Sequence, residues 1–115
     1  MRLCLGPLVV ALLLAFQLHP VFGQVVISEF MASNSSALAD QDGEYSDWIE
    51  LHNVGNVPTD LRDWFLTDDA AQLKKWRFPS LGMAANSYAV VFASGKDRAV
   101  AGSQLHANFS LDANG

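Results

Sequence analysis

An acidic run in the first half of the chain has the residue types of a calcium loop. Its sequence is Asp40-Gln41-Asp42-Gly43-Glu44, with carboxylates at alternate positions around a glycine. Oxygen ligands suit Ca²⁺, but a complete EF-hand loop needs about twelve residues, a bidentate acid at its end and flanking helices. Because these parts are missing, we favour a solvated acidic loop and keep weak calcium binding at Asp40–Glu44 as the alternative. Asp68-Asp69 is a weaker candidate, which we expect to cap a turn.

His52 and His106 are the candidates for hydrolytic chemistry. His52 has Asp47 and Ser46 nearby, which are the residue types of a catalytic triad. Asp47 and His52 lie five positions apart on one expected strand, so their side chains point to opposite faces. His106 lies in a segment of small residues without an acidic neighbour, and the chain contains no Gly-x-Ser-x-Gly elbow. We therefore predict a surface histidine, no catalytic residue and no enzyme.

Trp48 is a candidate for binding through an exposed aromatic ring. Strand alternation places Trp48 with Glu50 and His52, on the face opposite Ile49 and Leu51. An exposed tryptophan can stack on a sugar ring or anchor a partner protein. The alternative, which we favour, is that a loop such as residues 32–46 covers the indole.

Three further motifs give little chemistry. Gly95-Lys96 lacks the earlier glycine and the following Ser or Thr of a phosphate-binding loop, because Asp97 follows instead. Asn34-Ser35-Ser36 and Asn108-Phe109-Ser110 match the N-glycosylation acceptor pattern. We predict no bound metal and no cofactor.

The first 23 residues have the pattern of a cleaved signal peptide, which we expect to be a helix that precedes the folded domain. Met1-Arg2 supplies a short basic start, residues 8–16 are apolar, and Val21-Phe22-Gly23 precedes the expected cleavage after Gly23. The alternative is a membrane anchor, which needs about 20 apolar residues; Pro7 and Gln17 interrupt this run. We expect a secreted, extracellular or cell-envelope protein without stable membrane insertion after cleavage.

Charge and cysteine content narrow the function classes further. The chain has 115 residues and a formal charge of −5; removing residues 1–23 takes away Arg2 and no acid, which makes the charge −6. An acidic domain lacks the basic footprint that nucleic acid binding requires. Cys4, the only cysteine, lies in the expected signal peptide, so the mature chain has no disulfide and no cysteine metal ligand. The remaining 92 residues suffice for one core and one domain, at 24–115.

Alternating apolar residues and recurrent turn signals predict an all-β sandwich or small barrel. A turn with a positive φ at Gly55 or a neighbouring asparagine is expected after Asn53. In the first strand we expect Val26, Ser28 and Phe30 to share one face. We expect connections at 32–46, 54–63, 80–86 and 99–108, and strands at 24–31, 47–53, 64–67, 73–78 and 87–93. The side chains expected between the two layers include Ile49, Trp64, Trp76 and Phe92.

The chain resembles the lamin tail domain, an immunoglobulin-like module that also occurs in secreted bacterial proteins. The resemblance covers nearly the whole expected mature chain, in order. It is carried by Val26–Asn34, Asp47–Asn53, Leu61–Asp69, Lys75–Pro79, Tyr88–Arg98 and Phe109–Leu111.

The resemblance implies an immunoglobulin-like β-sandwich that is not itself catalytic. It also implies a domain that continues past Asn114-Gly115, so we expect residues 24–115 to be incomplete at the C-terminus. The expected function is an interaction or structural module of a larger extracellular or envelope-associated protein, with a protein or an extracellular polymer as its partner. The alternatives are a carbohydrate-binding module that uses Trp48 and an accessory domain of a secreted multidomain enzyme.

Overall fold

The structure, a computed structural model, describes residues 24–32 and 38–111. The expected signal-peptide helix at 1–23, the acceptor motif at Asn34 and the last four residues lie outside the described residues. Strands are the only regular elements within the described ranges. There, no helix is long and apolar enough to cross a membrane.

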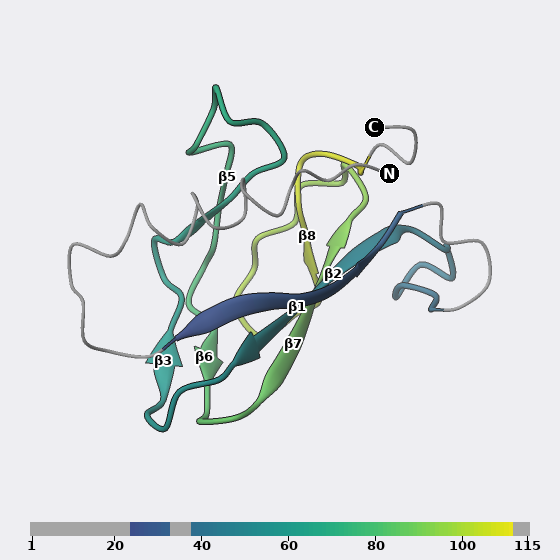
Figure 1. Ribbon diagram of the computed structural model, residues 1–115. Coiled ribbons are helices and arrows are strands. Elements are labelled where there is room, and N and C mark those ends of the chain that lie inside the picture. The colour runs from purple at the N-terminus through teal and green to yellow at the C-terminus, as the bar shows by residue number, and fades with distance from the viewer. Residues whose placement is uncertain (1–23, 33–37, 112–115) are drawn as a thin grey trace.

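A four-stranded sheet forms the first layer (Figure 1). Its strands follow the order β1-β2-β7-β8. β1, β2 and β7 pair antiparallel, whereas β8 runs parallel to β7. The bounds are Val25–Met31 for β1, Asp47–Asn53 for β2, Tyr88–Ala93 for β7 and Leu105–His106 for β8.

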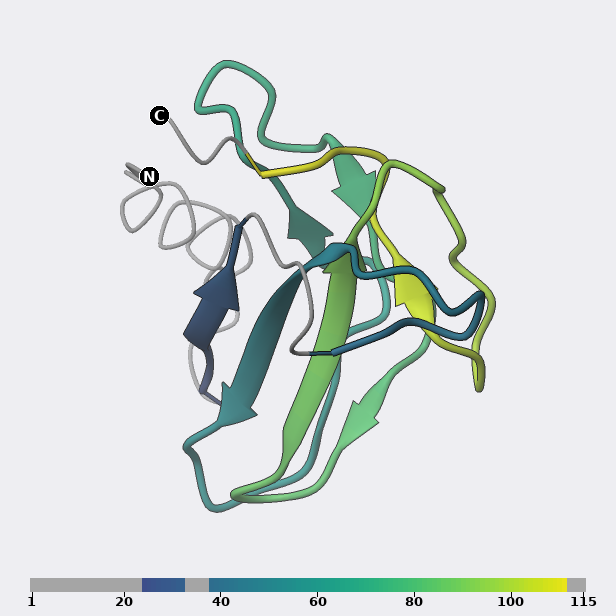
Figure 2. The same cartoon turned by 90° about the vertical axis from the view of Figure 1, so that its right-hand side faces the viewer.

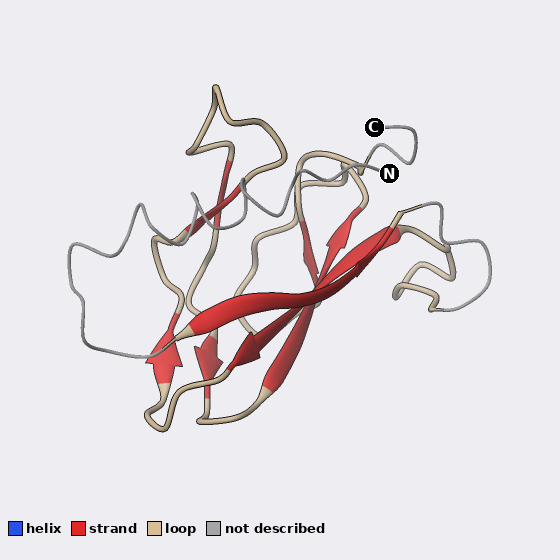
Figure 3. Ribbon diagram, in the orientation of Figure 1, coloured by secondary structure: helices blue, strands red, loops and turns tan. Residues whose placement is uncertain are grey.

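Two short antiparallel pairs lie opposite this sheet (Figure 3). β3 (Thr59–Asp60) pairs with β6 (Gly82–Met83), and β4 (Phe65–Leu66) pairs with β5 (Trp76–Arg77). The main apolar core joins both layers, so the all-β sandwich prediction is confirmed. Its members include Ile49, Leu51 and Val91 from the sheet and Leu61, Leu66, Trp76, Phe78 and Met83 from the opposite layer.

Residue pairing across β2 and β7 separates two buried faces. Ile49 is opposite Val91, and both belong to the main core. Trp48 is opposite Phe92, and both are buried outside that core, on the outer face of the sheet. The expected place of Phe92 between the layers is therefore wrong, because Phe92 is one position out of phase with Val91. Trp76 is buried as expected, and Trp64 packs half-buried against the core.

A β-bulge in β1 changes the expected faces of the first strand. The register moves between Ile27 and Glu29, so Ser28 is the extra residue. Phe30 then lies opposite the inward-facing Ile49 and does not share a face with Ser28 as expected. The alternation argument failed here because one inserted residue inverts every side chain that follows it.

The longest strands match their predicted ranges. The strand predicted at 47–53 is β2 itself, and those at 24–31 and 87–93 each differ from the structure by one residue. The strands predicted at 64–67 and 73–78 shorten to β4 and β5. β3, β6 and β8 lie in segments predicted as connections, because a two-residue strand is too short to show alternation.

Asn53 closes the turn after β2 with its side chain. This amide is fully buried and donates to the carbonyl oxygens of Val57 (2.9 Å) and Met83 (3.0 Å), and its Oδ1 accepts the N–H of Gly55 at 3.0 Å. Gly55 and Asn56 do not have positive φ, so that part of the turn prediction is wrong. The asparagine side chain supplies the turn instead, and it ties β2 to the second layer through β6.

Candidate functional site

Trp48 is not an open platform for a sugar ring. Only 9% of the residue is exposed, and its neighbours across the sheet are Met31 on β1 and Phe92 on β7. The indole N–H is buried without a hydrogen-bond partner. The open sugar platform expected at Trp48 is therefore contradicted by the burial of the indole, whereas its cover by a loop such as residues 32–46 stays a prediction.

The acidic run folds into a tight loop around the carboxylate of Asp40. Gly43 adopts a φ of 79°, and its N–H donates to the carbonyl oxygen of Asp40 at 2.9 Å. Asp40 Oδ1 accepts the backbone N–H groups of Asp42 (2.9 Å) and Glu44 (3.0 Å), and Oδ2 accepts the Ser46 hydroxyl at 3.1 Å. These bonds bury the Asp40 side chain completely.

Lys96 lies where a metal ion would have to bind. Single carboxylate oxygens of Asp40, Asp42 and Glu44 lie within 4.8 Å of one another. Lys96 Nζ lies 2.7, 2.8 and 2.5 Å from oxygens of these three residues, and Arg98 Nη2 lies 2.9 Å from Asp42. The loop thus has the convergence of a calcium site, but an ammonium group already contacts all three carboxylates. We name Asp40, Asp42, Glu44 and Lys96 the lysine clamp.

The clamp changes the ionisation of its own members. Burial would raise the pKa of Asp40, but the hydrogen bonds from Lys96, the two backbone N–H groups and Ser46 outweigh it and hold the pKa well below its ordinary value. Hydrogen bonds to Asp40, Asp42 and Glu44 raise the pKa of Lys96 above its ordinary range. Asp40 and Lys96 therefore remain charged throughout the neutral range.

The clamp joins two segments far apart in the sequence. Asp40 and Lys96 are 56 positions apart. Figure 2 shows residues 38–46 beside the connection between β7 and β8, and the backbone N–H of Gln41 donates to Gln104 Oε1 at 2.7 Å. The two connections are thereby held together beside the ends of β2 and β7.

His106 is buried on β8, which contradicts its expected place in a loop without acidic neighbours. Its Nδ1 lies 2.7 Å from Ser94 Oγ, and its ring stacks on Phe92 with 5.3 Å between centroids. Burial lowers the pKa of His106, while Asp40 acts in the opposite direction. Serine and histidine therefore meet in space, and Asp40 lies near enough to act on the charge of the ring, although β8 was not visible in the sequence.

This Ser94–His106 pair lacks the access that hydrolysis needs. His106 is 0% exposed, and its Nε2 has no hydrogen-bond partner. The Asp40 carboxylate accepts its four hydrogen bonds from other donors, and Ser94 Oγ also accepts the N–H of Lys96 at 3.1 Å. A general base has to come within hydrogen-bond reach of the proton that it takes, so the pair fits a structural role.

The other candidates have local roles. Asp69 Oδ1 accepts the N–H of Ala71 at 2.8 Å, which confirms the expected turn cap. His52 is half-buried, with Nε2 2.9 Å from Asn86 Oδ1, and its ring stacks on Tyr88. Asn108, in the second acceptor motif, is exposed and donates to the carbonyl oxygen of Lys75 at 2.9 Å.

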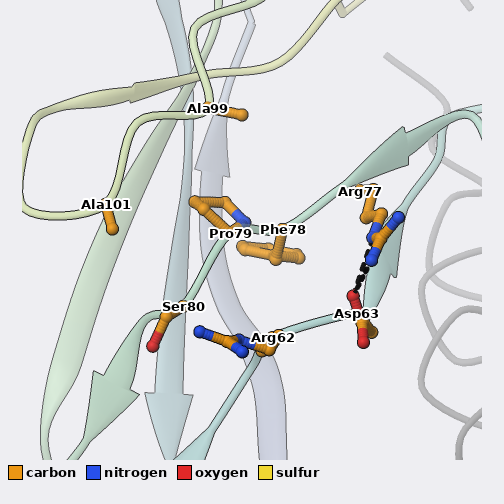
Figure 4. Close-up of a pocket in the computed structure, with 8 residues that line it drawn as sticks. All are labelled: Arg62, Asp63, Arg77, Phe78, Pro79, Ser80, Ala99 and Ala101. Carbon is orange, nitrogen blue, oxygen red and sulfur yellow. Dashed lines mark hydrogen bonds and ion pairs between the residues drawn. The ribbon is translucent and has the colours of Figure 1, made fainter.

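A pocket that sequence reasoning missed opens among the segments of the second layer (Figure 4). Its volume is about 670 Å³. Arg77 turns onto Asp63 and forms an ion pair, whereas Arg62 extends beneath Phe78 and Pro79 toward Ser80. Nothing in the sequence indicated that Ala99 and Ala101 would complete the wall. The lining includes Arg62, Asp63, Arg77, Pro79, Ser80 and Ala99.

Comparison with known proteins agrees with the resemblance drawn from the sequence. The family model described as Lamin Tail Domain matches residues 20–115. Neither the curated proteins nor the solved structures gave a match.

Proposed function

Because the chain belongs to the lamin tail domain family, we propose that it is a non-catalytic, secreted interaction module of a larger extracellular or envelope-associated protein. The domain is an immunoglobulin-like β-sandwich, and such folds carry their function in exposed sites on a rigid scaffold. The signal-peptide pattern of residues 1–23 supports export.

The observation that carries this proposal is an exposed apolar and aromatic patch on the outer face of the sheet. Val26, His52 and Tyr88 are consecutive partners across β1, β2 and β7, so their side chains share one face. Val90 lies two positions beyond Tyr88 on the same face. Tyr88 is 58% exposed, and Val26 and Val90 are each 36% exposed. We name these four residues the outer-face patch.

The aromatic part of the patch is held in place before any partner binds. The rings of His52 and Tyr88 stack with 4.0 Å between centroids and an interplanar angle of 9°. The hydrogen bond between His52 and Asn86 restrains the imidazole from its other side. Fixed side chains lose less conformational entropy on binding, which favours affinity.

A protein surface is the partner that suits this patch best. Contiguous apolar patches mark interaction sites, and tyrosine is frequent among residues that dominate binding energy. An uncharged extracellular or cell-envelope polymer that stacks on Tyr88 is the second candidate. The chain's charge of −5 argues against a nucleic acid partner.

Site-specific photo-crosslinking tests the patch. A photoreactive residue at position 90 should give a discrete protein adduct in cells of the source organism, and Tyr88→Ser should remove that adduct. The control is the same residue at Val100, which is 62% exposed and lies outside the patch. Identical products from both positions would contradict the proposal, and a polysaccharide adduct would support the second candidate.

Export is tested separately on the full chain with a C-terminal tag. We expect the tagged product outside the cytoplasm, with Gln24 as its new N-terminus. A product that stays in the cytoplasm and keeps residues 1–23 would contradict secretion without affecting the patch.

A further inference from the structure

Arg62 is the least engaged cation of the described residues, because its charge acts only at a distance, on Asp60, where it helps to lower the pKa of that carboxyl. Among the six Lys and Arg residues of the described ranges, it alone has neither an ion pair nor a ring contact. The others contact Asp68 (Lys75), Asp63 (Arg77), the acidic loop (Lys96 and Arg98) and the ring of Phe65 (Lys74).

The nearest carboxylates are already engaged. Asp60 accepts the backbone N–H groups of Arg62 (2.9 Å) and Leu81 (3.0 Å) and the Ser80 hydroxyl (2.8 Å). These bonds, led by that from the Arg62 backbone, lower the pKa of Asp60. Asp63 is paired with Arg77. The guanidinium N–H donors of Arg62 are therefore available to a ligand in the pocket.

A tight turn fixes the backbone that carries Arg62. The N–H of Trp64 donates to the carbonyl oxygen of Leu61 at 2.9 Å, and Asp63 adopts a left-handed φ of 69°. Leu61, which is 1% exposed, anchors the turn in the core. The backbone at the pocket's edge is thus fixed, and little backbone ordering is needed on binding.

The remaining lining selects the kind of anion. Pro79, Ala99 and Ala101 offer apolar contact beside Arg62, and the buried Phe78 forms the floor. A phosphate dianion would meet one free guanidinium and the carboxylate of Asp63. A carboxylate carries a single charge and matches one guanidinium fork with two parallel hydrogen bonds.

We propose that this pocket binds an acidic segment of a partner protein, with a glutamate or aspartate side chain on Arg62 and a neighbouring small apolar side chain against Pro79, Ala99 and Ala101. This pocket is separate from the outer-face patch. If the peptide does not bind here, the proposed function still stands, and if crosslinking at the patch gives no partner, binding at the pocket is still tested by its own experiment.

The test is an NMR titration of the full chain with the peptide Ac-Ala-Val-Glu-Val-Ala-NH₂. We expect saturable shifts at Arg62, Ser80, Ala99 and Ala101. Replacing the peptide's glutamate with glutamine, or making Arg62→Gln, should weaken binding about tenfold or more, because a charged hydrogen-bonded pair is lost. Arg62→Gln should fold normally, since the exposed side chain has no partner within the described residues.

Lys74→Gln is the matched control, since it removes one positive charge outside the pocket. The affinity of the Lys74→Gln variant for the glutamate peptide should stay within about twofold of the affinity of the parent chain, because exposed charges interact weakly at a distance. Equal weakening by Lys74→Gln, or equal binding of the glutamine peptide, would overturn the proposal. So would tighter binding of inorganic phosphate than of the peptide, or no saturable shift at millimolar peptide.

Discussion

Removing the carboxylate of Asp40 should be one of the most damaging single changes outside the main core. Asp40→Ala deletes four hydrogen bonds, including the one at 2.7 Å from Lys96. A hydrogen bond to a charged group contributes about 1.5–3 kcal/mol and a neutral one about 1 kcal/mol. In Asp40→Ala, Lys96 still contacts Asp42 and Glu44, and water can replace some of the lost hydrogen bonds. We therefore expect the free energy of unfolding to decrease by about 3 kcal/mol.

Two variants separate the charge from the hydrogen bonds. Asp40→Asn keeps an acceptor for the backbone N–H groups and loses the ionic contact, so it should cost about half as much as Asp40→Ala. Asp42→Asn removes a more exposed member of the lysine clamp and should cost much less. Urea unfolding of the full chain, followed by tryptophan fluorescence, measures all three.

The pH dependence gives an independent check. The pKa of Asp40 is lower in the folded chain than the value of about 3.9 in the unfolded chain. The contribution of the Asp40 carboxylate to the free energy of unfolding is therefore complete above about pH 5. It declines as the pH falls toward the pKa that Asp40 has in the folded chain. The stability difference between the parent and Asp40→Asn should shrink over that range. A loss below about 1 kcal/mol for Asp40→Ala, or a difference independent of pH, would refute the reasoning.

Other contacts and buried groups of the fold carry four further expectations. Burial lowers the pKa of His106, so the unfolded chain takes up a proton at a higher pH than the folded chain does. The free energy of unfolding should therefore decrease as the pH is lowered past about 6.5. His106→Gln should flatten this decrease in urea titrations. Asn53→Ala removes buried hydrogen bonds to Val57 and Met83 and should cost about 2–4 kcal/mol in the same assay. Millimolar calcium should leave the melting temperature unchanged, because Lys96 already contacts the three carboxylates that would bind the ion; a rise would contradict this. A variant that keeps Trp48 as its only tryptophan should show blue-shifted emission and resist iodide quenching, since the indole is buried.

The sequence predicted those parts of the fold that depend on neighbouring residues. The alternation of Ile49 and Leu51 located β2 and its buried face, and the segment around Val91 located β7. The bulge at Ser28 could not be predicted, since it becomes visible only when β1 is paired with β2.

The candidate site depended on contacts between residues far apart in the chain, which local patterns do not encode. The spacing of Asp40, Asp42 and Glu44 correctly brought three carboxylates together, but it gave no sign that Lys96 would join them. His106 was misplaced for the same reason: β8 has two residues, and its pairing with β7 is parallel, across a connection of eleven residues. Reading such contacts requires the topology.

The outer face of the sheet has a closed end and an open end, and this division decides where partners can bind. At the closed end, Trp48, Phe92 and His106 are buried beside the lysine clamp, which holds the two connections together. At the open end of the same strands, Tyr88 is exposed. Lys96 thus offsets part of the charge of the acidic loop beside the end where Trp48 is buried. The recognition sites that we propose are the outer-face patch and, on the second layer, Arg62.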